Sequence, residues 1–327
     1  MFYKTALKNF LKKPLKKFRK FILGDIERKI ELIQLSLGRI ELRQISNLEV
    51  NNLHDVEFKV FSNAGEDGII QFLIQRIFIK NKIFIEFGVE NYTESNTRFL
   101  LKNNNWSGLI IDGSIDNIEY IRRDSIYWQY NLKAEHAFIT AENINSIIQK
   151  NGISGEIGLL SIDIDGNDFW VWKAIECIYP CIVICEYNSL FGPKAKVTIP
   201  YNPNFQRTKA HYSNLYFGAS LAALEMLGKE KGYSLIGSNS IGSNGFFIRN
   251  DLLGYVRPLK PLTAEEAYVK SQFRQSRDRK GNLTFLSHEE GLKLIADMPV
   301  LDLERNRIFR ISEIIGRTED TRRYNHE

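Results

Sequence analysis

Two stretches of this chain combine the pattern of a buried strand with acidic residues: IFIEFGVENYTESNT at residues 83–97 and LLSIDIDGNDFWVW at residues 159–172. Each begins as an apolar run, ends at carboxylates and a glycine, and continues into a segment with a helical pattern. Strands that end in this way, followed by helices, build the ligand-binding edge of open α/β sheets. A third run, LIIDGS at residues 109–114, lies between them and ends similarly. The three strand ends predict an enzyme-like chain and the place of its site.

Strand and helix patterns alternate along the middle of the chain. The expected strands are residues 83–87, 108–112, 126–130, 158–163, 181–187, 233–238 and 245–249. Helical segments separate most of them, which predicts parallel strands with crossover helices on both faces. The short connection at 239–244 requires the last two strands to be antiparallel. We therefore predict an α/β fold with a Rossmann-like, doubly wound and mostly parallel seven-stranded sheet whose last strand is antiparallel.

The composition is that of a folded protein with an unevenly distributed charge. With 327 residues, 43% of them hydrophobic, the chain can bury a large core. The net charge is +5, yet residues 1–20 contain eight Lys or Arg and no acid. The remainder is slightly acidic, so we expect no nucleic-acid binding. Cys177, Cys181 and Cys185 are interpreted as buried reduced thiols rather than a cluster site, which favours a cytoplasmic protein.

The first 48 residues differ from the rest and predict a helical extension. Residues 1–22 combine lysines with apolar residues at helical spacing, which favours contact with an anionic membrane surface, on its inner face, or with an acidic partner. A solvated helix with a lysine-rich outer face is the alternative. Ile26 begins a heptad seam through 30, 33, 37 and 40, suited to a homo-oligomer contact or to packing on the body.

The remaining chain is expected to form two further parts. An α/β domain should occupy residues 56–257, and residues 258–327 should form a helical tail. Within this tail EEGLKLIADM and RIFRISEIIG each carry one apolar face and are expected to pack on the body.

Glu86, Gly88 and Glu90 end the first expected strand. A glycine there lets backbone approach a ligand closely, and Glu86 can accept hydrogen bonds from an ammonium or a hydroxyl. Only one glycine of the dinucleotide fingerprint is present, which favours a positively charged cofactor with fewer phosphates. The alternative is that Glu86 and Glu90 are solvated turn carboxylates.

Asp112, with Gly113 and Ser114 after it, ends the second expected strand. An acid at this position suits a bidentate bond to the two ribose hydroxyls of an adenosine. The site would then hold a nucleoside between the first and second strand ends.

The densest acidic segment follows the fourth expected strand. Alternation points Asp163 and Asp165 to the same side. Two carboxylates there indicate a hard divalent cation held by oxygens, or a general base beside a cofactor. Glu186 ends the next strand and adds a carboxylate to the same edge, while Asp168 fits either the site or a helix N-cap.

The long segment at residues 188–212 is expected to shape the pocket of a second substrate. Within it or beside it lie four basic residues that predict an anionic or phosphorylated ligand: Lys194, Lys196, Arg207 and Lys209. His211 is the candidate general base, with an exposed loop histidine as the alternative.

Together these motifs resemble the FkbM-type family of class I S-adenosylmethionine-dependent methyltransferases over residues 58–252. The resemblance rests on FSNAGEDGII, FIEFGVENYTESNTRFL, GLIIDGS, LLSIDIDGNDFWVWKAI, VICEYN and the stretch from YFGASLAAL to FFIRNDLL. It implies that Glu86 and Gly88 hold the amino-acid end of S-adenosylmethionine, that Asp112 holds its ribose, and that residues near Asp163 form the reacting centre. Glu90 stands where a second glycine is common.

The resemblance implies O-methylation of a sugar or glycan-related hydroxyl, in surface polysaccharide or natural-product biosynthesis. Because a sugar hydroxyl is a weak nucleophile, a base or a metal must take its proton. We assign this role to Asp163 and Asp165, with Mg²⁺ and Glu186 as a third ligand, and to His211. Two alternatives stay open: a membrane-surface or assembly protein with a non-catalytic cofactor-type fold, and a metal-dependent enzyme of another reaction type.

Overall fold

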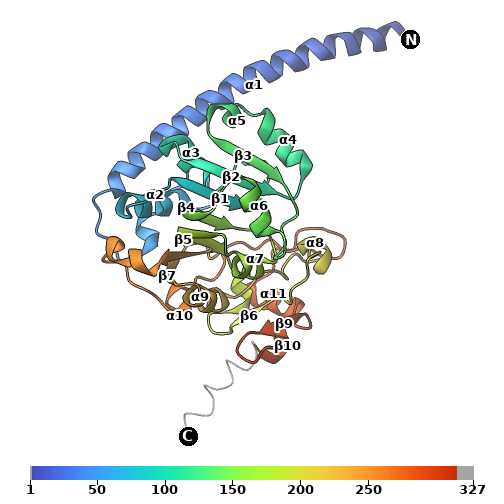
Figure 1. Cartoon of the computed structure of the whole chain (residues 1–327). Helices are drawn as coiled ribbons and strands as arrows, with labels where there is room; N and C mark the ends of the chain where they lie inside the picture. Colours follow the sequence, from blue (N-terminus) through green and yellow to red (C-terminus); the bar gives the residue numbers. More distant parts are fainter. Residues whose placement is uncertain (1, 315–327) are drawn as a thin grey trace.

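A seven-stranded sheet forms the centre of the molecule, in the order β3-β2-β1-β4-β5-β8-β7 (Figure 1). The computed structural model describes residues 2–314, with side chains from residue 24 onward. The strands are β1 (Ile83–Phe87), β2 (Ser107–Asp112), β3 (Leu132–His136), β4 (Gly155–Ile162), β5 (Ile178–Glu186), β7 (Tyr233–Ser238) and β8 (Asn244–Arg249). Strands β1 to β5 pair in parallel, whereas β8 is antiparallel to both β5 and β7. The predicted mostly parallel sheet with an antiparallel last strand is confirmed.

Helices cover both faces of this sheet, as a doubly wound fold requires. One face carries α2 (Glu66–Arg76), α3 (Arg98–Asn104), α4 (Ile115–Arg123) and α5 (Ser125–Gln129); the other carries α6 (Ile144–Lys150), α7 (Asp168–Ala174) and α9 (Leu221–Glu230). Successive strand residues enter opposite cores: Ile110 packs with the first group, and Leu109 and Ile111 with the second. This period of two places apolar side chains on both faces and explains why the strands are almost continuously hydrophobic.

The expected strand at residues 126–130 was wrong. Most of this segment lies in the short helix α5, and the third strand begins later, at Leu132. The Asp124 side chain accepts the N–H of Ile126 at 2.9 Å and caps the helix. A local N-cap of this kind outweighs the β-propensity of the aromatic residues that follow.

The N-terminal helix α1 (Phe2–Ile45) lies along the first face and projects beyond the body (Figure 1). Its Glu31 accepts from Arg98 at 2.8 Å and from Lys102 at 3.0 Å, both on α3. A Cβ on Gly38 would lie 2.5 Å from Val60 Cγ2, so the glycine permits this close contact. The predicted helical extension is present. The side chains of residues 1–22, on which the membrane prediction rests, lie outside the described part.

Residues 258–314 continue from the body and add a small second sheet. Their elements are α10 (Ala264–Ala267), α11 (His288–Leu294), β9 (Pro299–Asp302), β10 (Arg307–Arg310) and α12 (Ile311–Ile314). Strand β9 pairs with β10 and with β6 (Val197–Thr198), over an apolar cluster of its own. The segment RIFRISEIIG, expected to be helical, therefore begins as a strand, because its first four residues pair with β9.

Four short helical elements complete the described chain: η1 (Leu53–Val56), η2 (Ser189–Phe191), η3 (Asn250–Val256) and α8 (Arg207–Ala210). Among the described helices, none combines the length and the apolar character that a membrane crossing requires.

Candidate functional site

A cleft of about 1120 Å³ opens at the carboxyl edge of the sheet. The ends of four neighbouring strands line it, at residues 86–88, 111–113, 163–165 and 186–190. Parts of the C-terminal segment, at 270–276 and 286–289, line it as well. The carboxyl edge is where parallel sheets bind ligands, because the loops that follow the strands diverge there. The volume lies at the upper end for small-molecule pockets and leaves room for two ligands.

Gly88 joins the first and fourth strand ends. Its φ is +69°, a conformation that favours glycine, and its N–H donates to the Ile111 carbonyl at 3.0 Å. A Cβ at this position would lie 1.7 Å from the carbonyl oxygen of Asp163. The sequence suggested that Gly88 lets the backbone approach a ligand closely. In this structure Gly88 instead lies close to the backbone of Asp163, in the segment that carries the acidic cluster.

Glu86 is buried and anchors the loop that follows β1. Its Oε2 accepts from the Ser95 and Thr97 hydroxyls and from the Thr97 N–H, while Oε1 accepts the Asn96 N–H at 2.8 Å. Burial raises the pKa of Glu86, although these hydrogen bonds oppose the shift. The carboxylate lines the cleft, and Oε1, which accepts one hydrogen bond where Oε2 accepts three, keeps an acceptor position. Glu86 is thus neither solvated nor free.

Asp112 is held by the loops on either side of it. Its Oδ1 accepts the Ser114 N–H at 2.7 Å and the Asn117 side chain at 3.1 Å, and Oδ2 accepts the Glu90 N–H at 2.8 Å. Oδ2 retains one acceptor position. Glu90 has a φ of +47°, which favours glycine and explains in physical terms why a glycine suits this turn. Gly113 lines the cleft with Asp112 and Glu90, whereas Ser114 caps α4 instead.

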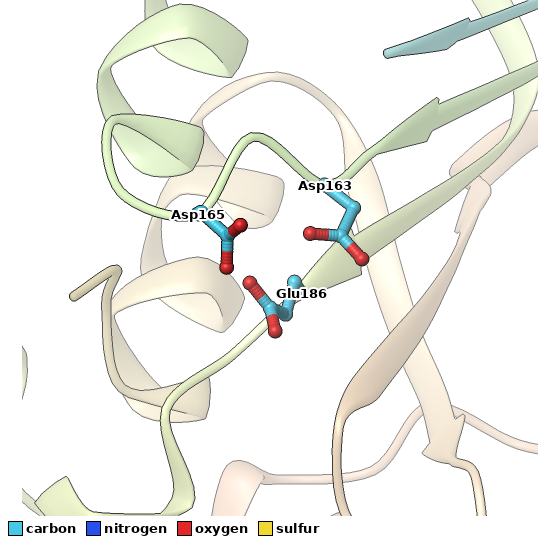
Figure 2. Close-up of side chains that lie close together, drawn as sticks. All are labelled: Asp163, Asp165 and Glu186. Carbon is cyan, nitrogen blue, oxygen red and sulfur yellow. The ribbon is translucent and has the colours of Figure 1, made fainter. Parts of the chain in front are cut away.

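Asp163, Asp165 and Glu186 form an acidic cluster on the cleft wall. One carboxylate oxygen of each lies within 4.8 Å of the other two. Figure 2 shows the three side chains turned toward one another, the two aspartates from the segment after β4 and Glu186 from the end of β5. Asp165 adopts a φ of +55°, which is strained for a residue other than glycine. Strain of this kind is found at functional sites.

Burial and neighbouring carboxylates raise the pKa of two members of this cluster, Asp163 and Glu186. Burial, and then the charge of Asp165, raises the pKa of Asp163 to about 8. Burial and the charges of Asp163 and Asp165 raise the pKa of Glu186 well above its ordinary value. Arg207 of α8 donates to Asp165 and partly offsets the repulsion. One guanidinium against three carboxylates leaves an excess of negative charge, which a proton or a further cation would balance.

The donor set fits a hard divalent cation. Oε2 of Glu186 is buried and has no hydrogen-bond partner among the described residues. A buried carboxylate oxygen without a donor is costly unless it is protonated or bound to a cation. Three carboxylate oxygens at these separations are the ligands that Mg²⁺ prefers. Arg207 is the competing occupant, because it already neutralises Asp165.

Asp168 has a structural place beside the cluster. Its Oδ1 accepts the Ile164 N–H at 2.8 Å, and its Oδ2 accepts the Gly166 N–H at 2.9 Å. The side chain is fully buried, and burial raises its pKa to about 6. Asp168 thus holds the turn that presents Asp163 and Asp165. The sequence allowed a site role or a helix N-cap for Asp168. The N-cap prediction was wrong, because Asn167 is the N-cap of α7 and Asp168 bonds instead to the turn before it.

His211 is not among the residues that line the cleft. Its Nδ1 lies 2.7 Å from the Ser213 hydroxyl, and burial, followed by the charge of Arg279, lowers its pKa. Arg207 lines the cleft instead, at the start of α8, the short helix that ends just before His211. The structure does not bring His211 together with the acidic cluster.

The other basic residues expected at the acceptor pocket lie elsewhere. Lys194 pairs with Glu265 at 3.4 Å, and Lys196 pairs with Glu304 at 2.6 Å. Neither lysine, nor Lys209, lines the cleft.

Sequence reasoning missed the C-terminal segment as part of the site. Lys270 and Arg274 line the cleft, the first paired with Glu289 at 2.7 Å and the second bonded to the carbonyls of Phe285 and Leu286. No motif marks this segment, and the resemblance ends before it. Its only sequence signal was the apolar face of 289–298, which predicted packing on the body but no contact with a ligand.

Comparison with known proteins found no family model and no curated protein that matches this chain. Among solved structures, the N-terminal domain of EvdMO1 with SAH bound has a TM-score of 0.33 at 11% identity, over 51% of this chain and 72% of that chain. The methyltransferase domain of bacterial CtHen1 has a TM-score of 0.33 at 15% identity, over 51% and 89%. The O-methyltransferase from Bacillus cereus in complex with SAH has a TM-score of 0.29 at 16% identity, over 51% and 72%.

Proposed function

We propose that this chain is an S-adenosylmethionine-dependent O-methyltransferase of the FkbM type, acting on a sugar or glycan-related hydroxyl in surface polysaccharide or natural-product biosynthesis. The observation that carries the proposal is one cleft in which the Gly88 turn, the Asp112 carboxylate and the acidic cluster meet. The carboxyl edge of an open α/β sheet is where nucleotide-like ligands bind, which supports the proposal.

The first two strand ends would hold the cofactor. Asp112 would accept hydrogen bonds from the ribose through Oδ2, and Oε1 of Glu86 would accept from the cofactor ammonium, each using its remaining acceptor position. When bound, S-adenosylmethionine supplies an electrophilic methyl group on a cationic sulfur. The acidic rim favours a ligand with this positive charge.

Asp163 would take the proton of the acceptor hydroxyl. The pKa of Asp163, about 8, is close to the pH at which most enzymes work. Near that pH a fraction of the carboxyl is ionised, and the ionised form is basic enough to take a proton. The proton would stay on the Asp163 carboxyl, with Glu186 as its neighbour. If a divalent cation is bound, Asp163, Asp165 and Glu186 would hold it, and it would make the acceptor hydroxyl more acidic.

The rest of the cleft suits a ligand rich in hydroxyl groups. Amide side chains both donate and accept, and nine of them line the cleft, although that of Asn188 is already bonded within the protein. The nine are Asn63, Asn91, Asn96, Asn167, Asn188, Asn214, Asn244, Gln272 and Gln275. Arg207, beside the cluster, would contact a negatively charged group on a phosphorylated acceptor. The enzyme would work in the cytoplasm, held to the inner face of the membrane by residues 1–22.

Titration calorimetry with S-adenosylmethionine, followed by methyl transfer to a panel of glycans and nucleotide sugars, tests the proposal. Wild type should bind the cofactor and form S-adenosylhomocysteine. Asp163→Asn should bind it similarly but turn over at least about a hundredfold more slowly, because the base is lost. Asp112→Asn should weaken binding.

Two results would point to other functions. Absence of binding heat would favour the non-catalytic fold. Bound metal and turnover of a glycan without S-adenosylhomocysteine would favour a different metal-dependent reaction, for which the acidic cluster alone would suffice.

A further inference from the structure

Helix α1 carries two apolar stripes with heptad spacing, and the α/β body contacts only one of them. The inner stripe consists of Glu31, Leu35, Gly38, Leu42 and Ile45. Leu35, Gly38 and Ile45 are buried against the body. The outer stripe consists of Ile26, Ile30, Ile33, Leu37 and Ile40. At 100° per residue, the centres of the two stripes are about 140° apart around the helix.

The outer stripe is exposed along its whole length. Its five side chains are 46–59% exposed. The sequence allowed two roles for this seam, an oligomer contact or packing on the body. The inner stripe packs on the body, so the outer stripe does not have that role. A continuous row of isoleucine and leucine on a surface helix marks an interaction site rather than the scattered apolar residues of an ordinary surface.

The spacing and the charges beside the outer stripe identify its occupant. Steps of four, three, four and three residues form a coiled-coil seam, which packs on another helix of the same spacing. Glu27, Gln34 and Glu41 flank one side, and Lys29, Ser36 and Arg43 flank the other. In a parallel pair of identical helices, Lys29 of one copy faces Gln34 of the other and Ser36 faces Glu41, so no like charges oppose one another. An antiparallel pair would oppose like charges.

We propose that copies of this chain associate in parallel through the outer stripes of α1. The body packs against the inner stripe, about 140° around the helix, and leaves the outer stripe exposed. Two heptads are marginal for the association of an isolated peptide, which must also become helical. Here packing of the inner stripe already orders the helix, so association does not include the entropic cost of forming it. Isoleucine at 26, 33 and 40, the d positions, favours three or four helices over two.

Sedimentation velocity of the full-length protein tests this proposal with a matched pair of variants. Ile33 and Leu32 are 59% and 58% exposed, but only Ile33 lies on the outer stripe. Wild type and Leu32→Lys should sediment as the same oligomer. Ile33→Lys should associate at least about tenfold more weakly, because it places a charge in the seam. Circular dichroism and urea unfolding of the monomer should be the same for both variants.

A disulfide reports the orientation. Parallel association places Leu37 of one copy against Leu37 of the next, so Leu37→Cys should form an intermolecular disulfide under mild oxidation. Leu32→Cys should not. Both cysteine variants also carry Cys177→Ser, because Cys177 is only partly buried, whereas Cys181 and Cys185 are buried.

A monomeric wild type at about 100 µM, or equal sedimentation of Ile33→Lys and Leu32→Lys, would overturn the proposal. So would a monomer that binds phosphatidylserine vesicles and is released by Ile33→Lys, since the stripe would then belong to a membrane surface. Failure of any of these tests does not affect the proposed enzymatic function, because none of them measures cofactor binding or turnover in the cleft.

Discussion

Replacing Asp163 by asparagine should stabilise the folded protein at alkaline pH. The ordinary pKa of this carboxyl is 3.8, and in the fold it is about 8, chiefly through burial. Below pH 3.8 the group is protonated in both states. Between these values the unfolded chain loses the proton and the folded chain keeps it, so stability falls as the pH rises through this window. Asparagine does not titrate, and the variant escapes this loss.

The two pKa values set the magnitude. They differ by about four pH units, and each unit corresponds to about 1.4 kcal/mol of unfolding free energy. The loss of stability above pH 8 therefore has a ceiling of roughly 6 kcal/mol. Two features reduce this loss of stability. Asp163 is partly exposed, and Asp163 and Glu186 influence each other's protonation. We therefore expect the variant to gain roughly 2 kcal/mol relative to wild type between pH 5 and pH 9.

Urea unfolding at pH 5 and pH 9 measures this gain, because other titrating groups contribute equally to both proteins and cancel in the difference. Asp297→Asn is the control, since its side chain is 89% exposed and its ion pair with Arg310 should contribute little. A difference between Asp163→Asn and wild type that does not change with pH would refute the idea that Asp163 retains a proton in the fold.

Three further changes probe the turns. Gly88→Ala places a Cβ on the Asp163 carbonyl and should cost about 3 kcal/mol or more of unfolding free energy. Gly155→Ala, at a similar φ of +73° with open space around it, should cost about 1 kcal/mol in the same urea assay. Glu90→Gly should be neutral or gain about 0.5–1 kcal/mol, since it relieves a positive φ, and cofactor calorimetry would show whether its carboxylate matters.

Glu31→Gln should loosen α1, seen as faster hydrogen exchange in residues 24–45. Burial opposes ionisation of Glu31, but the bonds from Arg98 and Lys102 outweigh it and hold its pKa below the ordinary 4.5. This contribution is present above pH 4.5 and is lost as the pH falls through the folded value.

The strand ends show how far local pattern determines a site. Asp112, Asp163 and Glu186 could be placed at one edge of a sheet because parallel strands with crossover helices put their carboxyl ends together, whatever the details of packing. The 126–130 error shows the limit: one capping hydrogen bond from Asp124 decided between helix and strand.

Residue types and spacing by themselves determined the α/β alternation, the acidic strand ends and the two-heptad seam of α1, since periodicity acts through neighbours along the chain. Only the tertiary structure decided that the body packs on the inner stripe, that Arg207 rather than His211 meets the acidic cluster, and that residues 270–276 line the cleft. Those outcomes depend on contacts between segments far apart in the chain. A local sequence pattern does not show which distant segments meet, so it does not predict the burial and charge that result. The pKa values that make Asp163 and Glu186 candidates for chemistry have the same origin.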